Sequence, residues 1–146
     1  MNTAVTFSSK TDDWATPQEF FDGLNREFGF TLDPCADDRN HKCAKYYTRA
    51  QDGLSQDWGG ERVFCNPPYG KEIGDWVRKS LEESAKPNTL VVMLIPARTD
   101  TKYFHEYIYG KAEIRFIRGR LKFGGQKNSA PFPSMVVIYG AGRATQ

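Results

Sequence analysis

The sequence predicts an α/β protein with a mostly parallel β-sheet, and two features point to this fold class. Short apolar segments typical of strands alternate with amphipathic segments of helical periodicity, and the run Leu90–Ile95 is apolar throughout. Alternating strands and helices favour parallel strands joined by crossover helices. An uninterrupted apolar strand is typical of the centre of such a sheet, where both faces are covered.

The composition fits one globular domain. Of the 146 residues, 39% are hydrophobic and 14% aromatic, and a chain of this length buries roughly two-thirds of its unfolded surface. We expect a flexible tail over residues 1–13 and a single domain over residues 14–141. No apolar run approaches the roughly 20 residues of a membrane span, and the N-terminus lacks a signal-peptide pattern. Three cysteines without such a signal indicate reduced thiols in a cytoplasm.

The first helix is expected to begin at Thr16-Pro17-Gln18-Glu19. Thr16 is predicted to cap the helix, Pro17 to take its first position and Glu19 to complete a capping box. An apolar stripe at helical spacing follows, formed by Phe20, Phe21, Leu24 and Phe28. Gly29 is predicted to end the helix.

Strands and one long helix are expected in the middle of the chain. Residues 30–32 predict a short strand that leads into Asp33, residues 44–48 a further short strand, and residues 62–65 a strand that ends before Asn66. A helix is then predicted by six residues at amphipathic spacing, and Pro87 prevents its continuation. These six residues are Ile73, Trp76, Val77, Ser80, Leu81 and Ser84.

The last third of the chain completes the sheet. Leu90–Ile95 predicts the central strand, which Pro96 closes, and a short helix is expected over residues 103–110. Two further strands are expected at residues 114–117 and 135–139, with a loop over residues 119–134 between them. Because ligands of open α/β sheets bind beyond the carboxyl ends of the strands, Asp33, Asn66 and Pro96 are expected to lie at one edge.

Asn66-Pro67-Pro68-Tyr69 carries the most specific chemistry in the sequence. Both prolines have a fixed φ and lack a backbone donor, so the Asn66 side chain and the neighbouring carbonyls are held stiffly outward. Rigid acceptors beside a flat ring suit the exocyclic amine of a planar base. This tetrapeptide resembles the motif of amino-methyltransferases that modify nucleic acids. The alternative is a proline-rich turn after a strand.

Charge is unevenly distributed along the chain. Residues 1–73 hold 8 Lys or Arg against 12 Asp or Glu, a net charge of −4, whereas residues 74–146 hold 12 against 6, a net charge of +6. A polyanion such as DNA could bind the basic second half through its phosphates, although a solvated surface explains the charge equally well. The candidate DNA-binding residues are Arg98, Lys102, Arg118, Arg120, Lys122 and Lys127.

Four segments in order resemble the bacteriophage-type, Dam-like DNA N-6-adenine methyltransferases over roughly residues 12–140. The segments are Trp14-Ala15-Thr16-Pro17, Leu32-Asp33-Pro34-Cys35-Ala36, Asp52-Gly53-Leu54 with Trp58, and Val63-Phe64-Cys65-Asn66-Pro67-Pro68-Tyr69-Gly70. The resemblance implies an abbreviated Rossmann-like class I methyltransferase fold whose terminal strand is antiparallel. It also implies methyl transfer from S-adenosylmethionine to a flipped-out adenine in double-stranded DNA, in the cytoplasm of a bacterial host of a phage.

The resemblance also implies roles for individual residues. Asp33 would lie near the amino-acid end of the cofactor, Thr16 and Pro17 near its carboxylate, and Asp52 near its adenine or ribose. The full set of cofactor-binding candidates is Trp14, Thr16, Pro17, Asp33, Pro34, Cys35, Asp52 and Asn66. The catalytic candidates are Asn66, Pro67, Pro68 and Tyr69.

Two departures from the family pattern predict a shortened cofactor pocket. The usual glycine-rich turn after the first acidic residue is replaced by Ala36-Asp37-Asp38-Arg39. Only 33 positions separate Asp33 from Asn66, too few for the usual set of strands and helices.

Other interpretations remain open from the sequence. A DNA-binding module without catalysis, or an N4-cytosine methyltransferase, would share the fold, although Asn66 favours adenine over cytosine. Cys35, His41, Cys43 and Cys65 have a spacing that fits no common zinc pattern, so no metal is expected. The sequence indicates neither the recognition site in DNA nor the oligomeric state.

Overall fold

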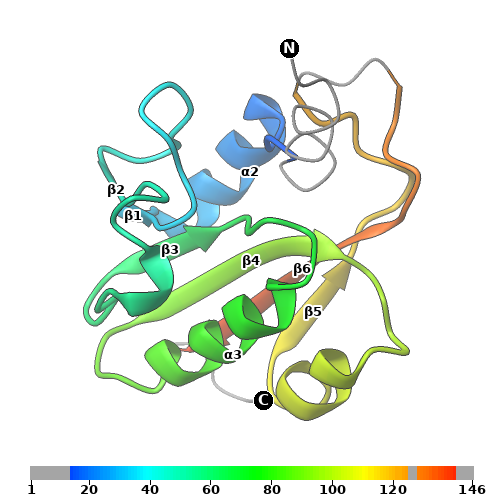
Figure 1. Ribbon diagram of the computed structural model, residues 1–146. Helices are drawn as coiled ribbons and strands as arrows, with labels where there is room; N and C mark the ends of the chain where they lie inside the picture. The colour runs from blue at the N-terminus through cyan, green and yellow to red at the C-terminus, as the bar shows by residue number, and fades with distance from the viewer. Residues whose placement is uncertain (1–13, 125–127, 141–146) are drawn as a thin grey trace.

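A six-stranded sheet in the order β2-β1-β3-β4-β6-β5 forms the centre of the computed structural model, which describes residues 14–124 and 128–140 (Figure 1). Parallel pairing joins β1 to β2 and β3, and β3 to β4, while β6 is antiparallel to both β4 and β5. The prediction of a mostly parallel α/β sheet with an antiparallel terminal strand is therefore confirmed. The strands are β1 Leu32–Asp33, β2 Lys45–Tyr46, β3 Arg62–Cys65, β4 Leu90–Pro96, β5 Glu113–Phe116 and β6 Ser134–Gly140.

Helices cover both faces of the sheet. Helix α2, Gln18–Phe28, lies on one face, whereas α3, Ile73–Ser84, and the short π-helix η2, Phe104–Ile108, lie on the other (Figure 1). A single 3₁₀ turn, η1, spans Gly53–Ser55. None of the helices in the described residues is long and apolar enough to span a membrane.

Central strand β4 supplies side chains to both halves of the core. Val91, Met93 and Ile95 belong to the cluster under α3 and η2, while the alternate residues Leu90, Val92 and Leu94 belong to the cluster under α2. All seven residues of β4 are buried, as its unbroken apolar sequence predicts.

The start of α2 differs from the prediction. The helix begins at Gln18, its N-cap is Pro17 with an extended ψ of 134°, and no side chain caps it. The hydroxyl of Thr16 is instead used as an acceptor for the side chain of Asn66. The prediction that Thr16 and Glu19 form a capping box is therefore wrong. Gly29 does end the helix, with a left-handed φ of 64°.

Other expected elements are found with small shifts. The strand over residues 62–65 and the helix over residues 73–84 have the predicted bounds. The first strand starts two residues later than expected, at Leu32, although the backbone N–H of Thr31 already donates to the carbonyl of Arg62. The expected tail over residues 1–13 lies outside the described residues.

Candidate functional site

A cavity of about 780 Å³ opens where the order of the strands reverses. From β1 the chain goes to β2 on one side of the sheet, and β3 then pairs with the other side of β1. Such a switch point leaves a crevice beyond the carboxyl ends of the strands. The volume lies within the range of small-molecule sites, roughly 300–1,000 Å³.

Most of the site residues predicted from the sequence line this cavity. Asp33 ends β1 and Asn66 follows β3, so the topology brings them to one edge. Pro17, Tyr69 and Pro96 are not among the lining residues. The predicted residues that do line it are Trp14, Thr16, Asp33, Pro34, Cys35, Asp52, Asn66, Pro67 and Pro68.

The amide of Asn66 has a defined orientation. Its Nδ2 donates to the carbonyl of Trp14 at 2.5 Å and to Oγ1 of Thr16 at 2.8 Å. Because both N–H donors of the amide are used in these two bonds, Oδ1 is the atom of the amide that can still accept a hydrogen bond. Oδ1 is shielded from water, and no described residue donates to it. A buried acceptor without a partner costs about 1–3 kcal/mol, so Oδ1 is an energetically costly feature of the site.

The residues that accept from the Asn66 amide, Trp14 and Thr16, lie at the start of the described chain. Gly124 donates its backbone N–H to the carbonyl of Ala15 at 2.8 Å, which ties the segment around Trp14 to the loop before β6. The Trp14 ring then packs edge-on against Phe123 and Phe132. Residues far apart in sequence thus hold Trp14 and Ala15, which line the cavity.

Tyr69 is turned into the protein and away from the cavity. Its hydroxyl donates to the carbonyl of Leu94 at 2.9 Å, and its ring packs against Phe123 and Phe132. Burial raises the pKa of this hydroxyl well above its usual value, so it remains a donor at neutral pH. The hydroxyl anchor was not foreseen from the sequence.

Asp33 organises the loop that follows β1. Its Oδ1 accepts from the backbone N–H of Cys35 at 3.2 Å, and its Oδ2 from that of Lys42 at 2.8 Å. Burial raises the pKa of this carboxyl, and the two N–H donors oppose the effect only in part. The loop thereby closes over the end of β1 without a glycine-rich turn.

Asp52 and Gly53 form a tight turn at the border of the cavity. Asp52 has a left-handed φ of 56°, and its side chain accepts from the backbone N–H of Leu54. A Cβ atom on Gly53 would lie 2.3 Å from the Pro34 carbonyl oxygen and 3.0 Å from the Trp76 ring. Glycine is therefore required at this close approach.

Several lining residues were not predicted from the sequence. Thr48 and Arg49 follow β2, and the rule that led to Asp33 and Asn66 also applies to this strand. Trp76 was assigned only to the amphipathic stripe of a helix, yet it also reaches the cavity. The remaining unpredicted lining residues are Ala15, Ala36, Asp37, Asn40, Lys42, Gly53, Phe64, Gly70, Lys71 and Glu72.

The cysteines do not gather around one point. The thiols of Cys35 and Cys65 lie 3.6 Å apart, whereas Cys43 packs in the core on the α2 face. Burial, with Asp33 and Glu61 nearby, raises the pKa of the Cys43 thiol to about 12. Nδ1 of His41 faces the carbonyl of Cys43 at 2.9 Å. Among the described residues, no three His, Cys, Asp or Glu side chains are grouped as metal ligands.

The described cations between Arg98 and Lys122 differ in their surroundings: some are exposed, whereas others are bound by carboxylates. Arg98, Arg118, Arg120 and Lys122 are exposed, and Lys102 forms only a long 3.8 Å pair with Glu106. Arg115, by contrast, makes two 2.7 Å hydrogen bonds to the carboxylate of Glu27 and one to Glu113. The predicted DNA-binding residue Lys127 lies outside the described residues.

The fold and the cavity define an α/β protein with a cavity at the switch point of its sheet. The family model for DNA N-6-adenine-methyltransferase (Dam) matches residues 3–142. Because this match covers nearly the whole chain, the protein belongs to the DNA N-6-adenine-methyltransferase (Dam) family and is a DNA N-6-adenine methyltransferase.

Two phage proteins are similar to the chain. A DNA N-6-adenine-methyltransferase of Haemophilus phage HP1 (strain HP1c1) is 31% identical over 147 residues, which cover 95% of this chain and 84% of that protein. A DNA N-6-adenine-methyltransferase of Escherichia phage T1 is 34% identical over 112 residues, which cover 75% of this chain and 46% of that protein. The chain thus spans less than half the length of the T1 relative.

Proposed function

We propose that the protein transfers a methyl group from S-adenosylmethionine to N6 of an adenine flipped out of double-stranded DNA, on an abbreviated Rossmann-like class I methyltransferase fold. The observation that carries this proposal is the oriented, unpartnered Oδ1 of Asn66, a residue that lines the cavity. Asn66, Pro67, Pro68 and Tyr69 are the proposed catalytic residues. The family membership supports the reaction, and the geometry supports the residues.

The cavity suits S-adenosylmethionine in size and in its polar groups. Asp33 offers a carboxylate for the cationic amine of the cofactor, and Asp52 offers one for a ribose hydroxyl or for the exocyclic amine of its adenine. Thr16 lies just before the start of α2, where the positive end of a helix dipole favours a carboxylate. When bound, the cofactor supplies a methyl group from a sulfonium centre.

The protein's own part in catalysis is to accept hydrogen bonds from the reacting amine, and the proton that N6 loses on methylation leaves to solvent water. Adenine N6 is a poor nucleophile because its lone pair is delocalised into the ring, and positive charge develops on it during attack. Its two N–H groups then become stronger donors. We assign Oδ1 of Asn66 and the carbonyl of Pro67 as their acceptors. No described residue donates to that carbonyl.

These acceptors stabilise the transition state more than the ground state, because the charge that they face is present only there. Removing one such oriented group from other enzymes costs about 3–4 kcal/mol. The shielding of Oδ1 means that neighbouring side chains must move aside as the amine enters.

DNA binding is assigned to the exposed cations after β4 and β5. Arg98 follows the carboxyl end of β4, and Arg118, Arg120 and Lys122 follow β5. Phosphate contacts by such side chains orient the duplex. Flipping the adenine costs a few kcal/mol, and stacking on an aromatic ring returns about 1–3 kcal/mol. Tyr69 is the proposed ring, and it can stack only after leaving its place against Phe132.

The proposal is tested by incubating the protein with duplex DNA and S-adenosylmethionine labelled in its methyl group. We expect label in N6-methyladenine at one sequence context, located by long-read sequencing. Label in N4-methylcytosine would instead assign the reaction to the cytosine branch. DNA binding without cofactor binding by calorimetry would indicate a non-catalytic DNA-binding module.

A further inference from the structure

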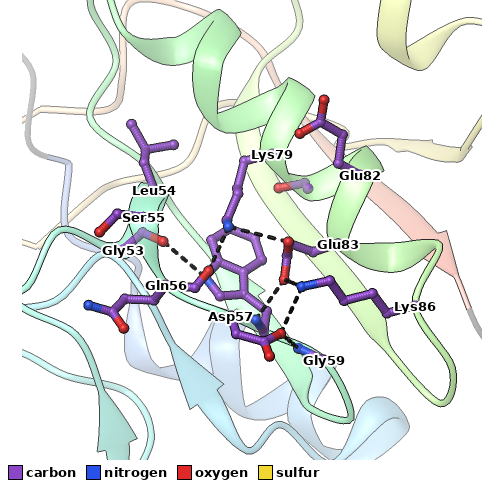
Figure 2. Close-up of polar contacts among 12 residues, drawn as sticks. Gly53, Leu54, Ser55, Gln56, Asp57, Gly59, Lys79, Glu82, Glu83 and Lys86 are labelled. Carbon is purple, nitrogen blue, oxygen red and sulfur yellow. Dashed lines mark hydrogen bonds and ion pairs between the residues drawn. The ribbon is translucent and has the colours of Figure 1, made fainter.

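The turn of Asp52 and Gly53 is held in place from outside the cavity. It begins the segment 52–59, which passes beneath α3 and is linked to that helix by polar contacts (Figure 2). The cavity side of the turn offers the carboxylate of Asp52. On the other side, the carbonyl of Gly53 accepts a hydrogen bond from Trp58, which does not line the cavity.

Trp58 connects the turn to the helix. Its side chain is fully buried, and its indole Nε1 donates to the carbonyl of Gly53 at 3.0 Å. Its backbone N–H donates to Oε1 of Glu83 on α3 at 2.6 Å. Trp58 therefore links helix α3 directly to the turn at the border of the cavity.

Glu83 is itself held by two lysines. Its side chain is 8% exposed and lies 2.8 Å from Nζ of Lys86 and 3.3 Å from Nζ of Lys79. Figure 2 shows both lysines directed towards Glu83 and the segment below it. Lys79 also donates to the carbonyl of Gln56 and lies 5.4 Å above the Trp58 ring, while Lys86 pairs with Asp57.

The turn is tightly packed and has an uncommon backbone conformation, so it depends on this support. Gly53 approaches Pro34 and the Trp76 ring so closely that even a Cβ atom would not fit. Asp52 occupies a left-handed conformation that few non-glycine residues adopt. Because such a conformation persists only where neighbouring groups hold it, loss of the support would let Asp52 shift relative to the cavity.

We propose that Trp58 and Glu83 are positioning residues for S-adenosylmethionine, which set the place of Asp52 and Gly53 without touching the cofactor. This inference rests on the proposed function, in which Asp52 contacts the cofactor. The affinity for the cofactor then depends on the hydrogen bond from Trp58 to Gly53 and on the carboxylate that holds Trp58.

The test is Trp58→Phe, which keeps an aromatic ring and removes the indole N–H. The dissociation constant for S-adenosylmethionine, measured by calorimetry on the full chain, is expected to rise about fivefold to tenfold, as for the loss of one hydrogen bond. The rate at saturating cofactor is expected to stay within about twofold, because the acceptors at Asn66 are unchanged. Ile138→Val, in the core on the α2 face, is the matched control for lost stability and should leave the dissociation constant unchanged.

Glu83→Gln is a second variant of nearly the same shape, in case Trp58→Phe does not fold. It keeps an acceptor for the Trp58 N–H but loses the charge that pairs with Lys79 and Lys86, so we expect a rise of about twofold to threefold. Unchanged cofactor affinity in whichever of the two variants folds would overturn the inference, as would an equal loss in Ile138→Val. If the unaltered protein bound no S-adenosylmethionine, the proposed function itself would fail and this inference with it.

Discussion

Asn66 presents one oxygen because its nitrogen is already occupied. Donation from Nδ2 to Trp14 and Thr16 prevents the amide from turning over, so Oδ1 remains the end of the amide that can accept. The sequence predicted Asn66 as an acceptor from its two following prolines. It did not predict that Thr16 orients it, because the hydrogen bond spans 50 positions of the chain.

Thr16→Val tests this orientation at the scale of one residue. Valine has nearly the shape of threonine but cannot accept from Nδ2, so the amide loses one of its two anchors. We expect kcat to fall about tenfold, the worth of one hydrogen bond of roughly 1–1.5 kcal/mol. Steady-state kinetics with saturating DNA and cofactor measure this change. Thr16→Ser keeps the hydroxyl and should retain kcat; a parental kcat in Thr16→Val would show that the anchor is unnecessary.

Tyr69 has two separable parts, a ring and a hydroxyl bonded to Leu94. Tyr69→Phe removes only the hydroxyl, so we expect a loss of about 1 kcal/mol in unfolding free energy and little change in KM for DNA. Tyr69→Ala also removes the ring and should raise KM for DNA about 10-fold to 100-fold, in line with stacking of about 1–3 kcal/mol. Equal KM values for both variants would argue against a stacking role. Urea unfolding and initial-rate assays provide the two readouts.

Among the elements, α3 carries a charge network whose protonation affects folding. Burial alone would raise the pKa of Glu83, but hydrogen bonds from Lys86, the Trp58 N–H and Lys79 hold it below its usual value of 4.5. A carboxylate with a lowered folded pKa stabilises the native state fully above the unfolded pKa. That stabilisation is lost as the pH falls through the lower, folded value.

Glu83→Gln should therefore be less sensitive to acid than the parent protein. We expect the parent to be more stable by about 1–3 kcal/mol at pH 7, and this difference to shrink as the pH falls below about 4.5. Urea unfolding at pH 7, 5 and 3.5 measures it. The comparison between variants is needed because the raised pKa of Asp33 acts in the opposite direction, with its contribution lost as the pH rises. A difference that is constant with pH would contradict the account.

The elements that the sequence predicted best are those with strong local signals. The helix over residues 73–84 and the strand over residues 62–65 have clear periodicity and clear end signals, and both were found with the expected bounds. The helix start at Thr16 was mispredicted because a tertiary partner, Asn66, takes the hydroxyl that a cap would use. The π-helical form of Phe104–Ile108 has no local signal that we recognise in the sequence.

At the scale of the whole molecule, the order of the strands brings the site together. Asp33 and Asn66 were expected to meet because each ends a parallel strand, and both line the cavity. The placement of Trp14 could not be predicted, because it depends on the pairing of Ala15 with Gly124. The division of the cations between Arg98 and Lys122 into exposed and engaged side chains likewise depends on long-range contacts such as that of Arg115 with Glu27.

That division predicts which cations bind DNA. The salt dependence of DNA binding is measured as the slope of log affinity against log salt concentration, to which each phosphate contact contributes about 0.9. The double variant Arg118→Gln, Arg120→Gln should therefore have a slope smaller in magnitude by up to about 1.8. Cofactor affinity should not change. Arg115→Gln is the matched control, because its guanidinium is engaged by Glu27 and Glu113, and it should leave the slope unchanged. Fluorescence anisotropy at several salt concentrations measures the slope, and an equal decrease in the control would refute the assignment.

The central claim is that Oδ1 of Asn66 accepts a hydrogen bond from the reacting amine. The most direct measurement is the single-turnover rate of adenine methylation by Asn66→Ala, made alongside its affinity for S-adenosylmethionine. We predict a rate at least about 10²-fold to 10³-fold below the parent, with cofactor affinity largely retained. Methylation by Asn66→Ala at the parental rate would contradict the claim.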